Sequence, residues 1–147
     1  LNDDMSLGEI LNWGLDKIVS QNCFPDYVVY LNPEYIFRPE GYLDKIVEEI
    51  IYKGLDSVFM GYQDYSDFWC RPDDTNEYVP VNTKLLNRED KFPLYKSLFG
   101  LGSIVRPKLI RKKTLVSNQN VEIISTTNIK YTFRTNNESM VEIIKSK

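Results

Sequence analysis

Helix-type and strand-type patterns alternate along the first part of the chain, and this alternation limits the fold more than any other feature. Apolar residues recur at helical spacing over residues 7–19 and again over residues 40–53. A continuous apolar run follows each pattern, at residues 27–31 and 56–62, as is typical of buried strands. Such alternation is typical of a parallel sheet covered by helices. We therefore expect a single α/β domain over residues 1–147.

Local signals mark where the helices begin and end. Ser6 and Glu9 have the spacing of a capping box, in which each side chain accepts a hydrogen bond from the other residue's backbone N–H. Gly54 follows the second helical pattern and suits the left-handed conformation that ends many helices. Thr135 and Glu138 repeat the capping-box spacing near the end of the chain. They predict a last helix, whose apolar face begins at Met140.

The alternation returns after residue 100. Residues 100–105 and 121–126 predict two further strands, and the basic residues 106–113 predict a short helix between them. The cations of this helix could bind a phosphate, or they could form a solvated helix face. The absence of interleaved aromatic residues favours the solvated face.

Residues 63–86 interrupt the pattern with a polar, turn-rich segment. We expect these residues to form loops or β structure that leave the main sheet. We also expect them to contact a second subunit, because exposed aromatic side chains often anchor interfaces. The aromatic residues concerned are Tyr62, Tyr65, Phe68, Trp69 and Tyr78.

Composition excludes several classes of function. The chain has no histidine, which rules out a Ser-His-Asp triad and a histidine metal site. Its two cysteines, Cys23 and Cys70, form neither a disulfide framework nor a metal cluster. The net charge of -3 gives no general attraction for nucleic acid or an anionic membrane. Neither an apolar run of the ~20 residues that span a bilayer nor a signal peptide is visible, so we expect a cytoplasmic protein.

Two loops carry candidate ligand-binding residues. In α/β sheets, ligands bind beyond the carboxyl ends of parallel strands. In the first loop Asn32 offers an amide, and Arg38 offers a planar fork for a carboxylate or phosphate; alternatively Arg38 pairs with a surface acid. In the second loop Arg88 and Tyr95 precede Gly100, although a surface loop with glycines placed for packing is the other interpretation. We expect removal of Arg38 to weaken acidic-sugar binding by roughly 1.5–3 kcal/mol and to change fold stability little.

Three motifs in one order resemble those of the acylneuraminate cytidylyltransferase family. LNPEYIFR, residues 31–38, is similar to a Leu-Gln-Pro-Thr-Ser-Pro-Leu-Arg stretch that ends a strand in the family. A helix and a DSV strand, residues 56–58, follow in both. REDKFPLY, residues 88–95, precedes Gly100 and is similar to the family's Arg-Gln-Asp-x-Pro-x-x-Tyr pattern, with one extra residue. The chain therefore resembles the C-terminal two thirds of this family.

The resemblance implies a Rossmann-like nucleotide-diphospho-sugar transferase fold, incomplete at the N-terminus, with residues 63–86 as a dimerisation excursion. It implies transfer of CMP from CTP to an acidic nonulosonic sugar in surface polysaccharide biosynthesis, with Mg²⁺ as cofactor. The implied partners are the acidic sugar, CTP and a second copy of the chain in a homodimer. No catalytic residue or metal ligand is assigned, and the implied substrate-binding residues are Asn32, Arg38, Arg88 and Tyr95.

Departures from the family pattern leave the activity open. The family's nucleotide-binding glycine loop is absent, so we expect a fragment or a degenerate member. Where the family has the metal-binding Asp-x-Asp-Thr pattern, this chain has residues 132–135, with Arg134 in place of an acid. Glu34 stands where the family has threonine, and would repel a sugar carboxylate close to it. The alternatives are a non-catalytic sugar-binding or dimerisation module on the same scaffold, and a glycosyltransferase-like domain.

Overall fold

The computed structural model describes residues 5–73, 75–81 and 90–135, and these residues form a mixed α/β structure. Most of the predicted elements are present, α1 and β7 with the predicted bounds and the others shifted by a few residues at their ends. In chain order the elements are α1 (Leu7–Val19), β1 (Val28–Tyr30), α2 (Tyr42–Lys53), β2 (Ser57–Asp64), β3 (Trp69–Cys70), β4 (Val79–Pro80), β5 (Leu94–Ser97), the 3-10 helix η2 (Phe99–Leu101), β6 (Ser103–Val105), α3 (Pro107–Arg111), β7 (Val121–Thr126) and the 3-10 helix η3 (Ile129–Thr132).

The main sheet is mixed, so the expectation of a parallel sheet is wrong. β2 and β7 are parallel, but β6 lies between β1 and β2 and is antiparallel to both. β5 precedes β6 on the same edge of β2 and is also antiparallel to β2. The physical reason is that the chain returns from the excursion directly along β2, whereas a parallel neighbour needs a crossover connection. Apolar periodicity carries no information on strand direction.

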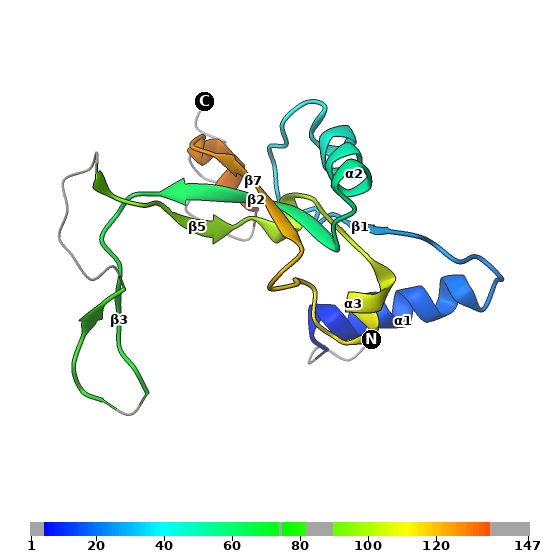
Figure 1. The fold of residues 1–147 in the computed structure, drawn as a ribbon, viewed down its shortest axis with the longest axis horizontal. Helices are drawn as coiled ribbons and strands as arrows, with labels where there is room; N and C mark the ends of the chain where they lie inside the picture. Colours follow the sequence, from blue (N-terminus) through cyan, green and yellow to red (C-terminus); the bar gives the residue numbers. More distant parts are fainter. Residues whose placement is uncertain (1–4, 74, 82–89, 136–147) are drawn as a thin grey trace.

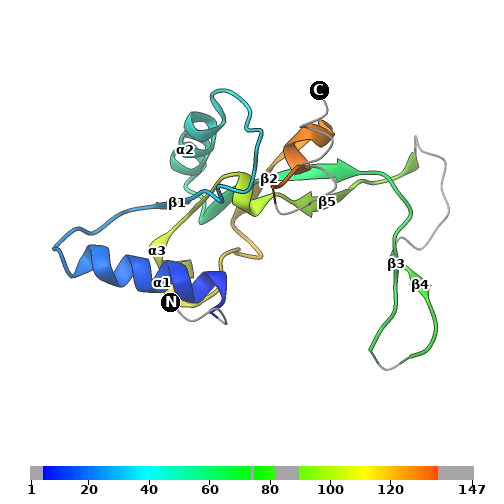
Figure 2. The ribbon, with the colours of Figure 1, turned by 180° about the vertical axis from the view of Figure 1, so that it is seen from behind.

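Helices cover both faces of this sheet (Figure 1). One face packs against α2, through a core that includes Ile46, Ile50, Val58, Met60 and Ile104. The other face packs against α1 and α3, through Leu15, Val105, Leu109 and Ile110. Figure 2 shows the same two layers from behind, with α1 and α3 together on one side of the sheet and α2 on the other.

The predicted helix boundaries have the predicted chemistry. The Ser6 hydroxyl accepts a hydrogen bond from the Glu9 backbone N–H, and the Glu9 carboxylate accepts one from the Ser6 N–H at 3.0 Å. Gly54 ends α2 in the left-handed conformation, with φ of 63°. The capping-box prediction and the Gly54 prediction are both confirmed. The last helix, predicted after Thr135, lies outside the described residues.

The excursion leaves the sheet, as predicted, after β2 ends at Asp64. Its described part includes the two-stranded β3–β4 sheet, in which Trp69 pairs with Pro80. Figure 1 shows this β ribbon standing away from the helix-covered body. Trp69 and Tyr78 are 56% and 67% exposed, so the ribbon presents aromatic surface to its surroundings.

Two smaller findings bear on the sequence analysis. Cys23 and Cys70 are both exposed, free thiols. Among the described residues, no helix combines the length and the apolar character needed to cross a membrane.

Candidate functional site

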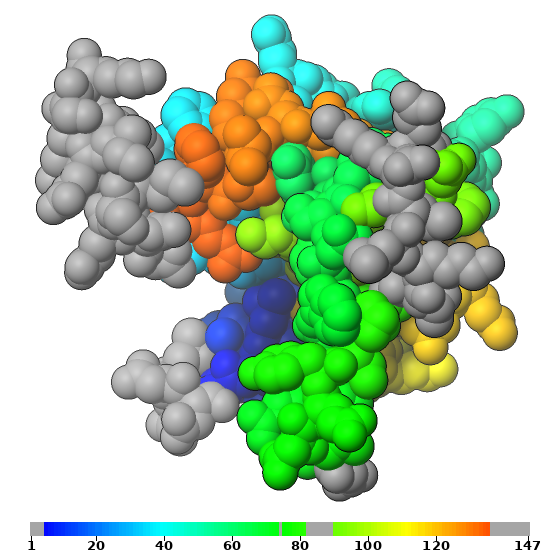
Figure 3. Space-filling view, turned by 90° about the vertical axis from the view of Figure 1, so that its left-hand side faces the viewer, coloured from blue at the N-terminus to red at the C-terminus, as the bar shows by residue number. Residues whose placement is uncertain are grey.

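Three segments that are distant in sequence meet at one end of the main sheet. They are the loop at residues 31–38, the 3-10 helix η2, and residues 129–135 beyond β7. The end of β1 and the start of β6 lie here, because β6 runs antiparallel to its neighbours. Figure 3 views the molecule from the side of the β3–β4 ribbon, and the orange-red segment that precedes residue 135 lies at the surface in this view. We call this meeting point the loop junction.

Asn32 holds the first two segments of the loop junction together. Its backbone N–H donates to the Gly100 carbonyl at 2.8 Å. Its side-chain oxygen accepts from the Glu34 N–H at 2.9 Å, and its amide nitrogen lies 3.3 Å from the Glu34 carboxylate. The Asn32 amide predicted to face a ligand is therefore engaged in shaping its own turn.

Arg38 lies in the loop junction, and its partners are backbone carbonyls. Its Nε donates to the Leu101 carbonyl at 2.8 Å and its Nη1 to the Tyr35 carbonyl at 3.3 Å. Its Nη2 donates to the Asn32 carbonyl. The half-buried guanidinium thus joins both ends of its own loop to η2. Three backbone carbonyls accept hydrogen bonds from this guanidinium, and this arrangement argues against the expectation that removal of Arg38 changes fold stability little.

Arg134 brings the third segment to the same place. Tyr35, which is 1% exposed, pairs with Arg134 in an isolated antiparallel bridge. The Arg134 Nη2 donates to the Tyr35 hydroxyl at 2.6 Å, and its guanidinium carbon lies 4.6 Å from the centre of the Tyr35 ring. Next along the chain, the Thr135 N–H donates to the Glu34 carbonyl at 2.9 Å. A cation is therefore fixed beside the loop that carries Glu34.

The pKa of Tyr30, the last residue of β1, reflects the charges near the loop junction. Burial raises the pKa of Tyr30, and the negative charge of Glu34 raises it further, while the positive charge of Arg134 lowers it. Tyr30, Glu34 and Arg134 therefore lie within electrostatic reach of one another. Together they offer a phenol, a carboxylate and a guanidinium, which can bind a ligand that carries both hydroxyls and a negative charge.

The two other predicted site residues are placed differently. Tyr95 lies on β5, where it pairs with Gln63 of β2; its hydroxyl is 3.5 Å from the Gln63 amide. Its contacts are therefore with β2, whereas those of Arg38 are with the loop junction. Arg88 lies outside the described residues.

Residues 132–135, which were compared with the metal-binding motif of the family that the sequence resembles, do not fit a magnesium ion. Mg²⁺ is held by oxygen ligands, mainly carboxylates and water. At this position the Thr132 hydroxyl donates to the Ile129 carbonyl at 2.8 Å, and the Arg134 guanidinium adds a positive charge. Among the described residues, no group of three or more His, Cys, Asp or Glu side chains could hold a metal ion.

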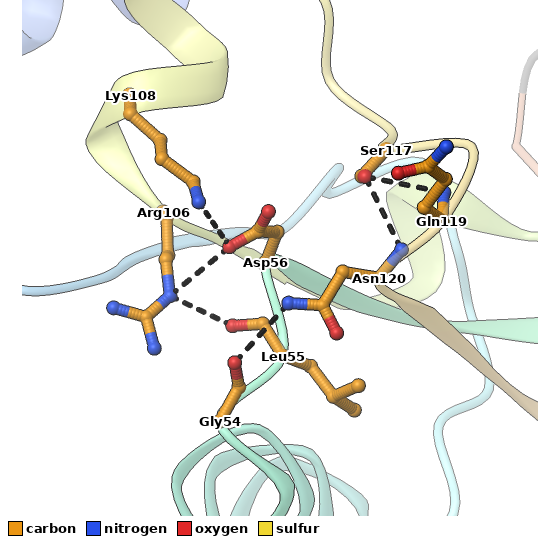
Figure 4. Close-up of polar contacts among 8 residues, drawn as sticks. All are labelled: Gly54, Leu55, Asp56, Arg106, Lys108, Ser117, Gln119 and Asn120. Carbon is orange, nitrogen blue, oxygen red and sulfur yellow. Dashed lines mark hydrogen bonds and ion pairs between the residues drawn. The ribbon is translucent and has the colours of Figure 1, made fainter.

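The predicted basic helix uses several of its cations in ion pairs. Asp56, which is 8% exposed, forms ion pairs with Lys108 at 2.6 Å and with Arg106 at 3.3 Å (Figure 4). The Arg106 Nε also donates to the Leu55 carbonyl at 2.8 Å. Farther along, Arg111 pairs with Asp16, and Lys113 with Glu9 at 3.1 Å. These pairs join α3 to β2 and α1, a structural role that neither sequence interpretation of the basic helix included.

Sequence reasoning did not single out Tyr30 or Tyr35. Tyr30 directly precedes residues 31–38 and Tyr35 lies within them, so the motif was found while these two tyrosines were overlooked. The available signal was the position of Tyr35 inside a polar loop, where a large apolar ring requires a buried partner surface.

Comparison of the sequence with protein-family models and with curated proteins gives no match.

Proposed function

We propose that the chain is a cytidylyltransferase-like domain that binds an acidic nonulosonic sugar at the loop junction. One observation carries the proposal. The resemblance draws attention to the sugar loop at residues 31–38 and to Gly100, and the departure from the family's metal motif draws attention to residues 132–135. In the structure these segments contact one another through Asn32 and Gly100, and through Tyr35 and Arg134.

The charge arrangement gives the sugar's carboxylate a partner. Arg134 is half-buried, and its Tyr35 contact occupies one of several guanidinium N–H donors. A bound carboxylate would accept hydrogen bonds from the remaining donors, and their positive charge would offset repulsion by Glu34. Arg38, whose donors point at backbone carbonyls, is in this proposal the residue that positions the loop.

The second candidate function is a sugar-binding module without nucleotidyl transfer, and Arg134 is the observation that favours it. Transfer of CMP from CTP requires the triphosphate charge to be neutralised by metal and cations. The residues at the family's metal position do not fit Mg²⁺, so we propose that this chain by itself binds CTP and Mg²⁺ weakly. Calorimetric titration tests this point, and a magnesium-dependent CTP affinity in the micromolar range would contradict it.

Titration of the protein with N-acetylneuraminic acid, followed by NMR chemical shifts, tests the main proposal. N-acetylmannosamine, which lacks the carboxylate, is the matched ligand control. Arg134→Met should weaken binding of the acid by roughly tenfold or more, the range for a hydrogen bond to a charged group, while Arg71→Met on the exposed ribbon should not. Equal binding of both sugars, or unchanged binding by Arg134→Met, would show that the loop junction does not bind the acid.

We also propose that the β3–β4 ribbon forms a homodimer contact. The exposed Trp69 and Tyr78 side chains support it.

A further inference from the structure

A concavity at the far end of β2 is separate from the groups that form the loop junction. β2 continues beyond its pairing with β6, and Tyr62 pairs with Thr126, the last residue of β7. Past this point the chain turns at Asp64 and borders an open concavity of about 410 Å³, within the usual size range of small-molecule sites. Its walls are Tyr62, Gln63, Asp64, Tyr65, Ser66, Lys91 and Thr127.

The walls of this concavity are held in place by local contacts. Tyr62 packs against the α2-side core. The Asp64 carboxylate accepts a hydrogen bond from the Ser66 backbone N–H at 2.9 Å, which closes the turn. The Lys91 side chain is 15% exposed and its ammonium lies 2.7 Å from the Asp67 carboxylate. The polar groups are therefore oriented before any ligand arrives.

The charges in the concavity argue against an anionic ligand. Lys91 already has Asp67 as its counter-ion, and Asp64 adds a negative charge to the lining. Hydrogen bonds from the Ser66 hydroxyl and backbone N–H lower the pKa of Asp64, which keeps its carboxylate an acceptor. The remaining lining offers the Thr127 hydroxyl, the Gln63 amide and the tyrosine rings. This is a set suited to a neutral ligand rich in hydroxyl groups.

We infer that the concavity at the end of β2 binds a neutral hexose unit. The Asp64 carboxylate would accept hydrogen bonds from sugar hydroxyls, Thr127 would donate or accept one, and the tyrosine rings would cover the apolar C–H face. A single hexose has about twelve non-hydrogen atoms, so the expected dissociation constant is about 1 mM at ordinary ligand efficiency. This site neither shares residues with the loop junction nor depends on the function proposed for it.

Saturation-transfer NMR with methyl α-D-glucoside tests the inference on the full chain. Tetrahydropyran, which has the ring without the hydroxyls, is the ligand control, and a site built for hydroxyls should reject it. Asp64→Asn keeps the shape and the turn-closing oxygen, and it should weaken glucoside binding about tenfold. Thr127→Val, at an exposed position, should weaken it about threefold, whereas Thr114→Val should have no effect.

Arg134→Met tests whether this site is distinct from the loop junction. The variant removes the cation of the loop junction and should leave glucoside binding unchanged. The inference is overturned if the wild-type protein gives no saturation transfer to the glucoside at about 20 mM, well above the expected dissociation constant. It is overturned equally if Asp64→Asn and Thr127→Val, with wild-type amide spectra elsewhere, bind as the wild type does. Displacement of the glucoside by N-acetylneuraminic acid would also overturn it, by showing one shared site.

Discussion

The backbone N–H of Asn32 donates to the Gly100 carbonyl over 2.8 Å, and this contact joins two loops that are nearly seventy residues apart. Such an approach requires a residue without a side chain at position 100. A Cβ there would lie 2.9 Å from both the Asn32 Cβ and the Tyr35 Cε2. Real Cβ atoms do not come this close to other atoms, so one of the loops must shift if Gly100 is replaced.

Gly100→Ala should therefore lower the free energy of unfolding by about 1–3 kcal/mol, the usual cost of overpacking. Gly14→Ala is the matched control, because nothing lies within 4 Å of its Cβ position and it is in the middle of α1. There the same change should raise stability by up to about 1 kcal/mol through helix propensity. Urea denaturation measures both variants, and equal effects would contradict the close approach.

Arg38→Met should lower the free energy of unfolding by roughly 1.5–3 kcal/mol, because it leaves loop carbonyls without their charged donor. Arg71→Met, on the exposed ribbon, should stay within about 0.5 kcal/mol of the wild type. Urea denaturation again gives the values. If Arg38→Met is as stable as the control, the carbonyl contacts do not hold the loop.

Asp56→Ala should destabilise the fold by roughly 1–3 kcal/mol, since it removes the shared counter-ion of Arg106 and Lys108. Lys113→Met breaks the exposed pair with Glu9, whose side chains are 60% and 38% exposed, and should cost no more than about 1 kcal/mol. Thermal unfolding of the two variants compares a buried carboxylate with an exposed pair. Equal losses would mean that the burial of Asp56 is unimportant.

Glu9 gives the stability of α1 a pH dependence. The Ser6 backbone N–H and the Lys113 ammonium hold the pKa of Glu9 below its ordinary value of 4.5. Because the pKa is lowered in the folded state, the stabilisation is present above the unfolded pKa and is lost as pH falls through the folded pKa. Glu9→Gln should thus be less stable than the wild type at neutral pH, and the difference should shrink at about pH 3. Glu77→Gln, on the exposed ribbon, should show no such convergence of urea midpoints.

Local elements were largely predictable because each depends on neighbouring residues. The capping box at Ser6 and the left-handed Gly54 need only a few residues of context, and β7 needs only its own apolar run. The predicted strand at residues 100–105 begins at Ser103 instead, because Gly100 and Leu101 form a 3-10 turn against the Asn32 loop. That turn depends on a partner segment elsewhere in the chain, which local patterning cannot reveal.

The candidate site was less predictable for the same reason. The two loops were expected to lie together because parallel strands end together. Only the Gly100 end of the second loop reaches the first, beside an antiparallel β6 that begins where β1 ends, whereas Tyr95 lies on β5. The sequence does not reveal whether an arginine binds a ligand or a backbone carbonyl. Arg38 donates to the Leu101 carbonyl, which lies 63 residues away in the chain. Arg134 was noted only because it stands in place of an acid of the metal-binding pattern. Its contact with Tyr35 could not be inferred from the spacing of residues in the sequence.

The proposed dimer contact gives the last prediction, which concerns the β3–β4 ribbon. Trp69 and Tyr78 are exposed on a ribbon that stands away from the body, where little of the chain's own core can cover them (Figure 1). Exposed aromatic residues of this kind are the commonest anchors of protein interfaces, and losing one costs about 2 kcal/mol or more of binding free energy. Trp69→Ser should therefore weaken dimerisation about thirtyfold or more in sedimentation equilibrium. Tyr52→Ser, at a residue that is 90% exposed on α2, is the control and should leave the association unchanged. A wild-type protein that stays monomeric at the highest concentrations, or an equal loss in both variants, would mean that the ribbon is not the dimer contact.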